Sequence, residues 1–336
     1  MKRINFNLSC LLVLLFISVN AYAGCTANSA SAPTIVPPNL TVQRDTPVGT
    51  MIGAQVMSGV DTPFTCVNDN PPITNQDLGI RSSGTFVTTI GGRRIYSTSL
   101  PGVGYSLGIV SVNNCGGTSG WIDGTLAFPG NINSRLICRN LAGMLANQPP
   151  TVQTMIQYYK TGDITSGTVN AQGLGAYLTR INGSIFTEVA VNTASFSVTA
   201  LACTVTNPSI VVNMGTVVSR NFSGVGSSPS DGTTKNFDIN LSCNPGTSVN
   251  LQIDGDAWSA PLGVLNNGTG TGFASGVGIQ LLTSANSPFA LGTPTAITNS
   301  ASSNQSIPLL AQYYQTDSTI APGTVNITAT FTLTYQ

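Results

Sequence analysis

Gly323-Thr-Val-Asn-Ile-Thr-Ala-Thr-Phe-Thr-Leu-Thr-Tyr-Gln336 is the stretch that decides the fold class. From Val325 to Tyr335 every odd-numbered residue is apolar or aromatic, and every even-numbered residue is threonine or asparagine. Successive side chains of a β-strand point to opposite faces of the sheet. The alternation therefore predicts a strand with one buried face and one solvent-facing face.

The beginning of the sequence has the pattern of an export signal. Two basic residues precede an apolar run that is too short to span a bilayer, and Ala21-Tyr22-Ala23 is a small-residue cleavage site. We therefore expect residues 1–23 to be a signal peptide and the mature chain to start at Gly24. A lipid-modified Cys25 is the alternative.

The composition indicates a folded and β-rich chain. Apolar residues make up 41%, with many valines, isoleucines and threonines, and the 36 glycines and 19 prolines supply turns. Charged residues make up only 7%, and the formal net charge is zero. No nucleic-acid partner is expected, because binding to phosphates requires a basic patch.

Six cysteines follow the predicted signal peptide, and four of them form two pairs with nearly equal separations in the sequence. The other two cysteines make a third pair. Export places the chain in a compartment where disulfides persist, and closing loops of the longer size restricts the unfolded chain by roughly 4 kcal/mol. The predicted disulfides are Cys25–Cys66, Cys203–Cys243 and Cys115–Cys138.

Short alternating segments separated by turn residues recur upstream of the last strand, which predicts an antiparallel β-sandwich. An internal echo predicts a related sandwich before it. Gln157-Tyr-Tyr-Lys-Thr161 and Gly167-Thr-Val-Asn170 parallel Gln312-Tyr-Tyr-Gln-Thr316 and Gly323-Thr-Val-Asn326. Chance recurrence of common turn and strand residues is the alternative. The predicted domains are residues 24–200 and residues 201–336.

The end of the sequence resembles pilin subunits of the chaperone–usher pathway. Gly323 is the fourteenth residue from the end and Tyr335 is the penultimate one, as in that family. Gly276-Val-Gly-Ile-Gln-Leu281 is similar to the family's mid-domain strand. The resemblance covers about residues 200–336 and implies an incomplete immunoglobulin-like sandwich that lacks its last strand. An ordinary last strand in a complete sandwich is the alternative.

This resemblance implies assembly partners. In that family a periplasmic pilus chaperone lends a strand to an open groove, and the next fimbrial subunit replaces that strand during assembly at the outer-membrane usher. Only Gly24 precedes the first cysteine of the mature chain, where single-domain pilins carry a donor strand. We therefore expect a subunit that accepts a strand and donates none. The implied groove residues are Val325, Ile327, Phe331, Leu333 and Tyr335.

A strand acceptor with an additional N-terminal domain resembles the two-domain tip adhesins, similar to the type 1 fimbrial adhesin family. Cys66-Val-Asn-Asp-Asn-Pro71 is similar to a Cys-x-Asn-Asp-x-Pro stretch of the mannose-binding members, in which the aspartate accepts hydrogen bonds from sugar hydroxyls. A turn in which Asn and Asp bond their own backbone is the alternative. The ligand-binding candidates implied by this resemblance are Asn68, Asp69, Asp77, Gln157 and Asp163.

Trp121 and Asp123 form a second candidate site, within Cys115-Gly-Gly-Thr-Ser-Gly-Trp-Ile-Asp-Gly124. An aromatic ring beside an acceptor-only carboxylate, in a glycine-rich loop fixed by a disulfide, can bind a sugar. A tryptophan packed against the disulfide in the core is the alternative.

Catalysis is not expected. The chain has no histidine, which excludes the usual Ser-His-Asp, Cys-His and His-metal arrangements, and its twelve acidic residues show no distinctive pair. The sequence therefore predicts a binding protein without a metal or cofactor, exported through the periplasm to the fimbrial tip at the cell surface. Its receptor is expected to be a host glycan or glycoprotein. The alternatives are a structural minor pilin, a tip adaptor or an adhesin for a protein receptor.

Overall fold

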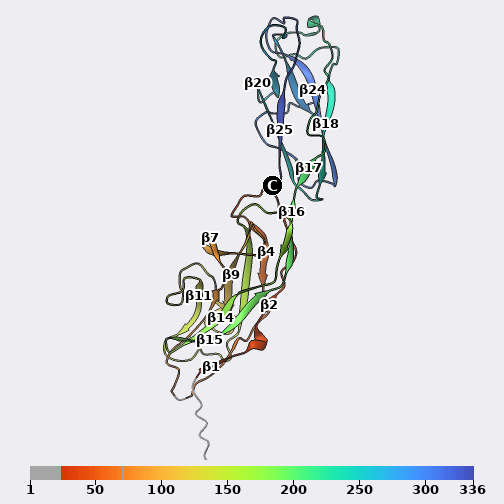
Figure 1. The fold of residues 1–336 in the computed structure, drawn as a ribbon. Coiled ribbons are helices and arrows are strands. Elements are labelled where there is room, and N and C mark those ends of the chain that lie inside the picture. Colours follow the sequence, from red (N-terminus) through yellow and green to blue (C-terminus); the bar gives the residue numbers. More distant parts are fainter. Residues whose placement is uncertain (1–23, 70) are drawn as a thin grey trace, which may run out of the picture.

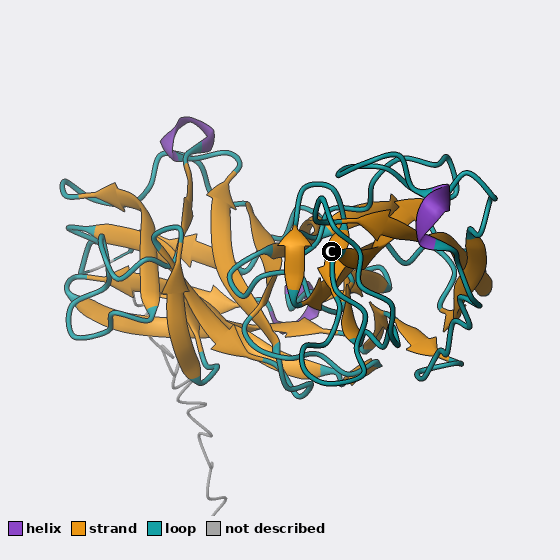
Figure 2. Ribbon diagram, turned by 90° about the horizontal axis from the view of Figure 1, so that it is seen from above, coloured by secondary structure: helices purple, strands orange, loops and turns teal. Residues whose placement is uncertain are grey.

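The computed structural model describes residues 24–69 and 71–336 (Figure 1). The predicted signal peptide, residues 1–23, and Asn70 lie outside the described residues. Strands dominate the described chain (Figure 2), and its helices are three single 3-10 turns, which confirms the all-β fold class. No helix in these ranges is long and apolar enough to cross a membrane. The 3-10 turns are Ser29–Ser31, Cys115–Gly117 and Ser219–Asn221.

The molecule has two lobes in Figure 1, and each lobe has its own hydrophobic core. The first core draws its buried residues from Cys25 to Val198, and the second from Cys203 to Tyr335. These cores belong to two β-sandwiches in tandem, as the sequence predicted. The proposed boundary near Ala200 falls close to the change from one core to the other.

The first sandwich has two main sheets. One sheet has the order β4 (Met51–Met57), β12 (Val152–Lys160), β9 (Val103–Ser111), β8 (Arg93–Ser97) and β7 (Phe86–Ile90), with β10 (Ser119–Trp121) also paired to β9. The other sheet has the order β11 (Ser134–Asn140), β6 (Gln76–Ser82), β14 (Gln172–Ile181), β15 (Ser184–Thr193) and β2 (Thr34–Ile35).

Two small sheets complete this sandwich. The first pairs β1 (Gly24–Ala27) with β5 (Phe64–Val67), and the second has the order β13 (Gly167–Val169), β16 (Phe196–Leu201) and β3 (Leu40–Gln43).

The second sandwich is also built from two sheets. The larger sheet has the order β17 (Cys203–Val205), β18 (Lys235–Cys243), β24 (Asn304–Gln315), β22 (Val277–Thr283), β21 (Val264–Asn266) and β20 (Ala257–Ser259). The smaller sheet has the order β23 (Thr295–Thr298), β19 (Val249–Gly255) and β25 (Ala329–Thr334).

The last strand, β25, keeps the predicted alternation but is shorter than predicted. Phe331 and Leu333 are half-buried, whereas Thr330 and Thr332 are exposed. The ladder between β19 and β25 starts at Ala329, and no described strand pairs with residues 325–328. A strand is defined by its pairing, so the alternating sequence extends further than the observed strand.

All three predicted disulfides are present. Cys25 and Cys66 are directly opposite each other across β1 and β5, and Cys203 and Cys243 are directly opposite across β17 and β18. The Cα atoms of each of these two pairs are 4.0 Å apart. The same pairing at the start of each sandwich supports the interpretation of two related modules.

The two copies of the internal echo also lie at equivalent places in their sandwiches. Tyr158 lies on β12, which is between β4 and β9, and Tyr313 lies on β24, which is between β18 and β22. Both strands are central in their sheets and both tyrosines are buried. This placement favours related sandwiches over chance recurrence.

The C-terminus lies between the two lobes (Figure 1). The backbone N–H of Asp45 donates to the Tyr335 carbonyl, and the Tyr335 N–H donates to Asp45 Oδ2, both at 2.9 Å. The Arg44 guanidinium lies 4.6 Å from the centre of the Tyr335 ring. The Gln43 side chain donates to the Gly246 carbonyl at 3.1 Å. These contacts form the joint between the sandwiches.

Candidate functional site

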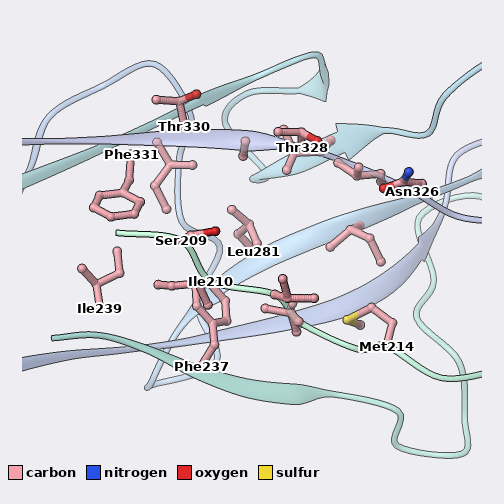
Figure 3. Close-up of a pocket in the computed structure, with 18 of the residues that line it drawn as sticks. Ser209, Ile210, Met214, Phe237, Ile239, Leu281, Asn326, Thr328, Thr330 and Phe331 are labelled. Carbon is pink, nitrogen blue, oxygen red and sulfur yellow. The ribbon is translucent and has the colours of Figure 1, made fainter. Parts of the chain in front are cut away.

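An open groove of about 710 Å³ runs along the C-terminal strand of the second sandwich (Figure 3). Residues 325–331 form one wall, and residues 208–212 with Met214 form the other. Side chains from both sheets line the space between the walls. They include Phe237, Ile239, Ile253, Leu265, Ile279, Leu281 and Ala311.

The groove is a part of the core that the described chain does not fill. Phe331, Ile210 and Ile239 gather in it in Figure 3, while Thr330 points away. The wall residues Ile210, Val325 and Phe331 pack against the second core and are only half-buried. Within the described residues, β25 pairs with β19 alone. The groove therefore presents apolar side chains beside a free strand edge.

The structure places the predicted groove residues in two locations. Val325, Ile327 and Phe331 line the groove. Leu333 is half-buried beyond this lining, and Tyr335 is 2% exposed, with its hydroxyl donating to the Cys203 carbonyl at 2.9 Å. Burial raises the pKa of the Tyr335 phenol. The interpretation of Tyr335 as a groove residue is corrected, because its side chain is fixed at the joint.

Sequence reasoning missed the second wall of the groove. Ile210, Val212 and Met214 are half-buried, and the residues between them, Val211 and Asn213, are exposed. This is the same period of two that marks the C-terminal strand. The pattern was visible in the sequence, but it occurs in a segment that forms no strand.

A second cavity of about 560 Å³ continues from the groove. It is lined by residues 215–219 on one side and residues 320–325 on the other, and Val325 borders both spaces. Tyr313 of β24 also lines it. The open space therefore reaches from Phe331 to the turn that contains Gly323.

In the first sandwich, a strand occupies the equivalent space. β16 is antiparallel to β13, where Gly167 faces Val198, and parallel to β3, where Val198 faces Leu40. Val198 is 1% exposed, and the Phe196 ring centre lies 4.8 Å from that of Tyr158. A strand inserted here thus buries its apolar side chains in the core.

The internal echo relates this filled slot to the open cavity. Tyr158 and Gly167, which contact or pair with β16, correspond in the echo to Tyr313 and Gly323. Tyr313 and Gly323 both line the second cavity. The second sandwich is open where the first sandwich contains β16.

Comparison with known proteins gives a family match for the part of the chain that contains the groove. Residues 187–336 match a family model described as "Fimbrial protein". The second sandwich is accordingly called the fimbrial sandwich below.

The whole chain is similar to a "Fimbria adhesin protein" of Klebsiella pneumoniae, with 26% identity over 336 residues that cover 95% of this chain and 96% of the relative. This relative and the family match confirm the predicted resemblance to fimbrial adhesins. Among solved structures, the CupB6 tip adhesin of Pseudomonas aeruginosa shares 15% identity and covers 93% of both chains, with a TM-score of 0.38. The receptor binding domain of adhesin MrkD1P of Klebsiella pneumoniae shares 19% identity, covers 55% of this chain and 99% of its own, and has a TM-score of 0.33.

Asn68 and Asp69 lie at the end of the first sandwich that is far from the fimbrial sandwich, beside Gly24, which pairs with Val67 (Figure 1). The Asn68 Oδ1 accepts a hydrogen bond from the Ile73 N–H at 2.7 Å, so Asn68 shapes the loop. Asp69 is exposed, and its carboxylate makes no hydrogen bond or ion pair with the described residues. Asp69 is therefore accessible to a ligand.

Asp77 has a different environment. It is 1% exposed, and its two carboxylate oxygens accept from Arg139 Nε at 2.8 Å and from Arg180 Nε at 2.7 Å. A ligand hydroxyl would have to displace an arginine to reach this carboxylate. The placement favours a structural role for Asp77 and speaks against the sugar-binding role that the resemblance implied.

Trp121 lies on the outer face of its sheet, where it pairs with Gly108. Ile122, the next residue, belongs to the core instead. The alternative of a core tryptophan packed on the disulfide is therefore wrong. The Asp123 carboxylate accepts from Thr125 N at 2.7 Å and from Arg135 Nη1 at 2.9 Å, so it is already paired.

The remaining candidates do not join the Asn68–Asp69 loop. Gln157 is 4% exposed, and its Nε2 donates to the Gly53 carbonyl at 3.1 Å. It shares the outer face with Trp121, because both pair with alternate residues of β9. Asp163 is exposed and follows β12, whose last residue, Lys160, donates to the Arg44 carbonyl at the joint. The predicted binding residues thus occupy three separate regions.

Proposed function

We propose that the protein is a fimbrial tip adhesin that binds a host-surface glycan and is anchored in the fibre by a donated strand. Residues 24–200 are the receptor-binding domain in this proposal, and residues 201–336 are the fimbrial domain. The unfilled groove beside β25 carries the proposal. Binding, without catalysis, is the proposed activity.

The chemistry of the groove favours a β-strand as its occupant. Apolar side chains such as Val325, Ile327 and Phe331 need apolar partners at alternate positions, and the free edge of the chain next to them needs backbone donors and acceptors. Fully burying one such side chain is worth about 1.5–3 kcal/mol, and each unmet buried backbone group costs about 1–3 kcal/mol. An extended segment satisfies both requirements at once.

The proposal includes three assembly partners. A periplasmic chaperone would supply the strand before assembly at an outer-membrane usher, and the next fimbrial subunit would supply it in the fibre. The chain would pass through the periplasm and reside at the fimbrial tip on the cell surface. β16, which pairs with β13 and β3 in the first sandwich, supports the proposal as an analogue of such a strand.

The groove is tested by expressing residues 24–336 with and without a fused donor strand. A segment with apolar residues at alternate positions is joined to Gln336 by a short glycine-rich linker. We expect soluble monomer with a raised melting temperature only from the fused chain. The matched control carries serine at the apolar donor positions. Equal yield and melting temperature in all three chains would contradict a strand-accepting groove.

The receptor site is tested on a glycan array with the strand-complemented chain. We expect Asp69→Ala to abolish binding of the glycans that are held at the Asn68–Asp69 loop, because an exposed carboxylate accepts hydrogen bonds from two sugar hydroxyls. Asp163→Ala, a second exposed carboxylate of the first sandwich, is the matched control near the joint. Loss of binding in Asp163→Ala alone would move the site to the joint. No binding to any glycan would favour a protein receptor or a structural tip subunit.

A further inference from the structure

The arginines of the first sandwich fall into two groups according to their partners. Five of the seven form ion pairs with carboxylates, and the other two, Arg93 and Arg94 of β8, form none within the described residues. The chain is poor in charge overall, so an unneutralised pair is unusual for it. The paired arginines are Arg44, Arg81, Arg135, Arg139 and Arg180.

Arg93 is held in place by two aromatic residues. Its guanidinium carbon lies 4.0 Å from the centre of a Trp121 ring, and its Nη1 donates to the Tyr159 hydroxyl at 3.0 Å. A guanidinium has five N–H donors, so most of them stay available after this single bond. The side chain is half-buried, which weakens the competition from water for a bound anion.

Arg94 is a separate case, because adjacent residues of a strand point to opposite faces. Its guanidinium lies 3.8 Å from the centre of the Phe86 ring, and its Nε donates to Asn133 Oδ1 at 2.9 Å. Arg94 therefore does not converge with Arg93 on one ligand. The site on the outer face consists of Arg93 and its two aromatic supports.

The Trp121 ring packs close to Gly108 and is stacked by Arg93. Below the ring lies Gly108, where a Cβ atom would be 3.0 Å from Trp121 Cε3 and 2.8 Å from the Met155 methyl group. The glycine thus leaves room for the indole, and the Arg93 guanidinium stacks on a Trp121 ring. The group that faces a ligand here is the guanidinium, and the indole positions it.

We propose that Arg93, positioned by Trp121 and Tyr159, binds the anionic group of an acidic glycan. This inference rests on the proposed glycan binding and names the ligand class of a second contact region, which lies on the outer face of the first sandwich and apart from the Asn68–Asp69 loop. A planar guanidinium binds a carboxylate or sulfate through two parallel hydrogen bonds, and stacking on an aromatic ring pre-organises it. The Trp121 N–H has no partner within the described residues, so it is a further donor for the same ligand.

The test is a glycan array with strand-complemented residues 24–336 that includes neutral, sialylated, uronic-acid and sulfated glycans. We expect acidic glycans to bind, and Arg93→Gln to weaken them tenfold or more, because it removes charge-assisted hydrogen bonds. Arg93→Lys keeps the charge but loses the planar fork, so it restores only part of the affinity. Arg220→Gln, at an exposed arginine of the fimbrial sandwich, is the charge-matched control and leaves binding unchanged.

The outcomes separate this inference from the proposed function. Binding of neutral glycans alone would overturn the acidic-ligand inference and leave the lectin proposal intact. Acidic-glycan binding that survives both Arg93 variants would overturn the site. Binding of no glycan, with capture of an acidic protein, would overturn the glycan proposal. Melting temperatures of the variants are compared first, and Arg93→Lys decides the result if Arg93→Gln does not fold.

Discussion

The two sandwiches differ at the slot that β16 fills in the first of them. In the first sandwich, β16 lies between β13 and β3, and its apolar side chains are buried. In the fimbrial sandwich, the corresponding space beside Val325 is a groove that continues into a second cavity. The cores show the same contrast, since the fimbrial core has many more half-buried apolar residues packed on it. A closed and an open version of one architecture thus occur in one chain.

The family match extends beyond the fimbrial sandwich to the strand before it, β16. The match begins at residue 187, so it includes β16 as well as the fimbrial sandwich that starts at Cys203. The strand that precedes the fimbrial sandwich in sequence therefore completes the sandwich before it. Within this chain, that is the same relation that we propose between neighbouring subunits of the fibre.

The largest difference in stability is expected when a charge is placed at corresponding positions of the filled slot in the first sandwich and the open groove in the fimbrial sandwich. We expect Val169→Asp, at the position that corresponds to Val325 in the internal echo, to destabilise the first sandwich by about 4 kcal/mol or more, because it buries an unpaired carboxylate beside β16. Val325→Asp, in the half-buried wall, should cost about 1 kcal/mol without a donor strand and more with one. Urea denaturation of both variants measures the difference. Equal losses would show that the two spaces are equally closed.

A smaller effect is expected at the two glycines of the internal echo. A Cβ atom on Gly323 would lie 2.4 Å from the backbone of Phe273 and Ala274, whereas on Gly167 its nearest neighbour is a Leu100 methyl group at 2.9 Å. A backbone cannot yield as a side chain can, so Gly323→Ala should cost about 1–3 kcal/mol and Gly167→Ala less than about 1 kcal/mol. Thermal unfolding of both variants checks this order, and the reverse order would contradict it.

The smallest expected effect concerns the joint and its dependence on pH. Burial raises the pKa of Asp45, but hydrogen bonds from Arg44 and from the Tyr335 backbone lower it by more, so the pKa is below its ordinary value. A lowered carboxyl pKa stabilises the contact above the unfolded pKa of about 3.9, and this contribution is lost as the pH falls through the folded pKa. NMR shifts of Tyr335 should therefore be constant from about pH 5 to 8 and change below about pH 4.

Asp45→Asn is the control for this titration. It removes the ionisable group and keeps an oxygen that can accept from the Tyr335 N–H. The acid-induced change at Tyr335 should disappear in this variant. A change that persists would assign the titration to another group.

Regular patterns in the sequence were sufficient to predict the fold class. The alternation from Val325 to Tyr335 gave the last strand, and equal cysteine separations gave the disulfides. Side-chain pairing over long distances was not predictable in this way. Asp77 is paired by Arg139 and Arg180, and nothing local in the sequence indicates these partners.

The candidate sites show the same limit. Trp121 was visible as an aromatic residue beside a carboxylate, but its cover, Arg93, comes from another strand. One wall of the groove was predicted from the alternation in the C-terminal strand. The other wall, around Ile210, was not predicted. Residues that meet only after the sheets form carry no periodic signal, and the proposed contact between Arg93 and Trp121 is of this kind.

The connection between the sandwiches has a mechanical consequence. β16 ends at Leu201 and β17 begins at Cys203, so the tether between the two sandwiches is a continuation of the strand that closes the first one. The hydrogen bonds of a sheet run across its strands. Tension applied through the fimbrial sandwich pulls β16 along its own length, so its bonds to β13 and β3 bear the load together in shear. They are not peeled apart one after another.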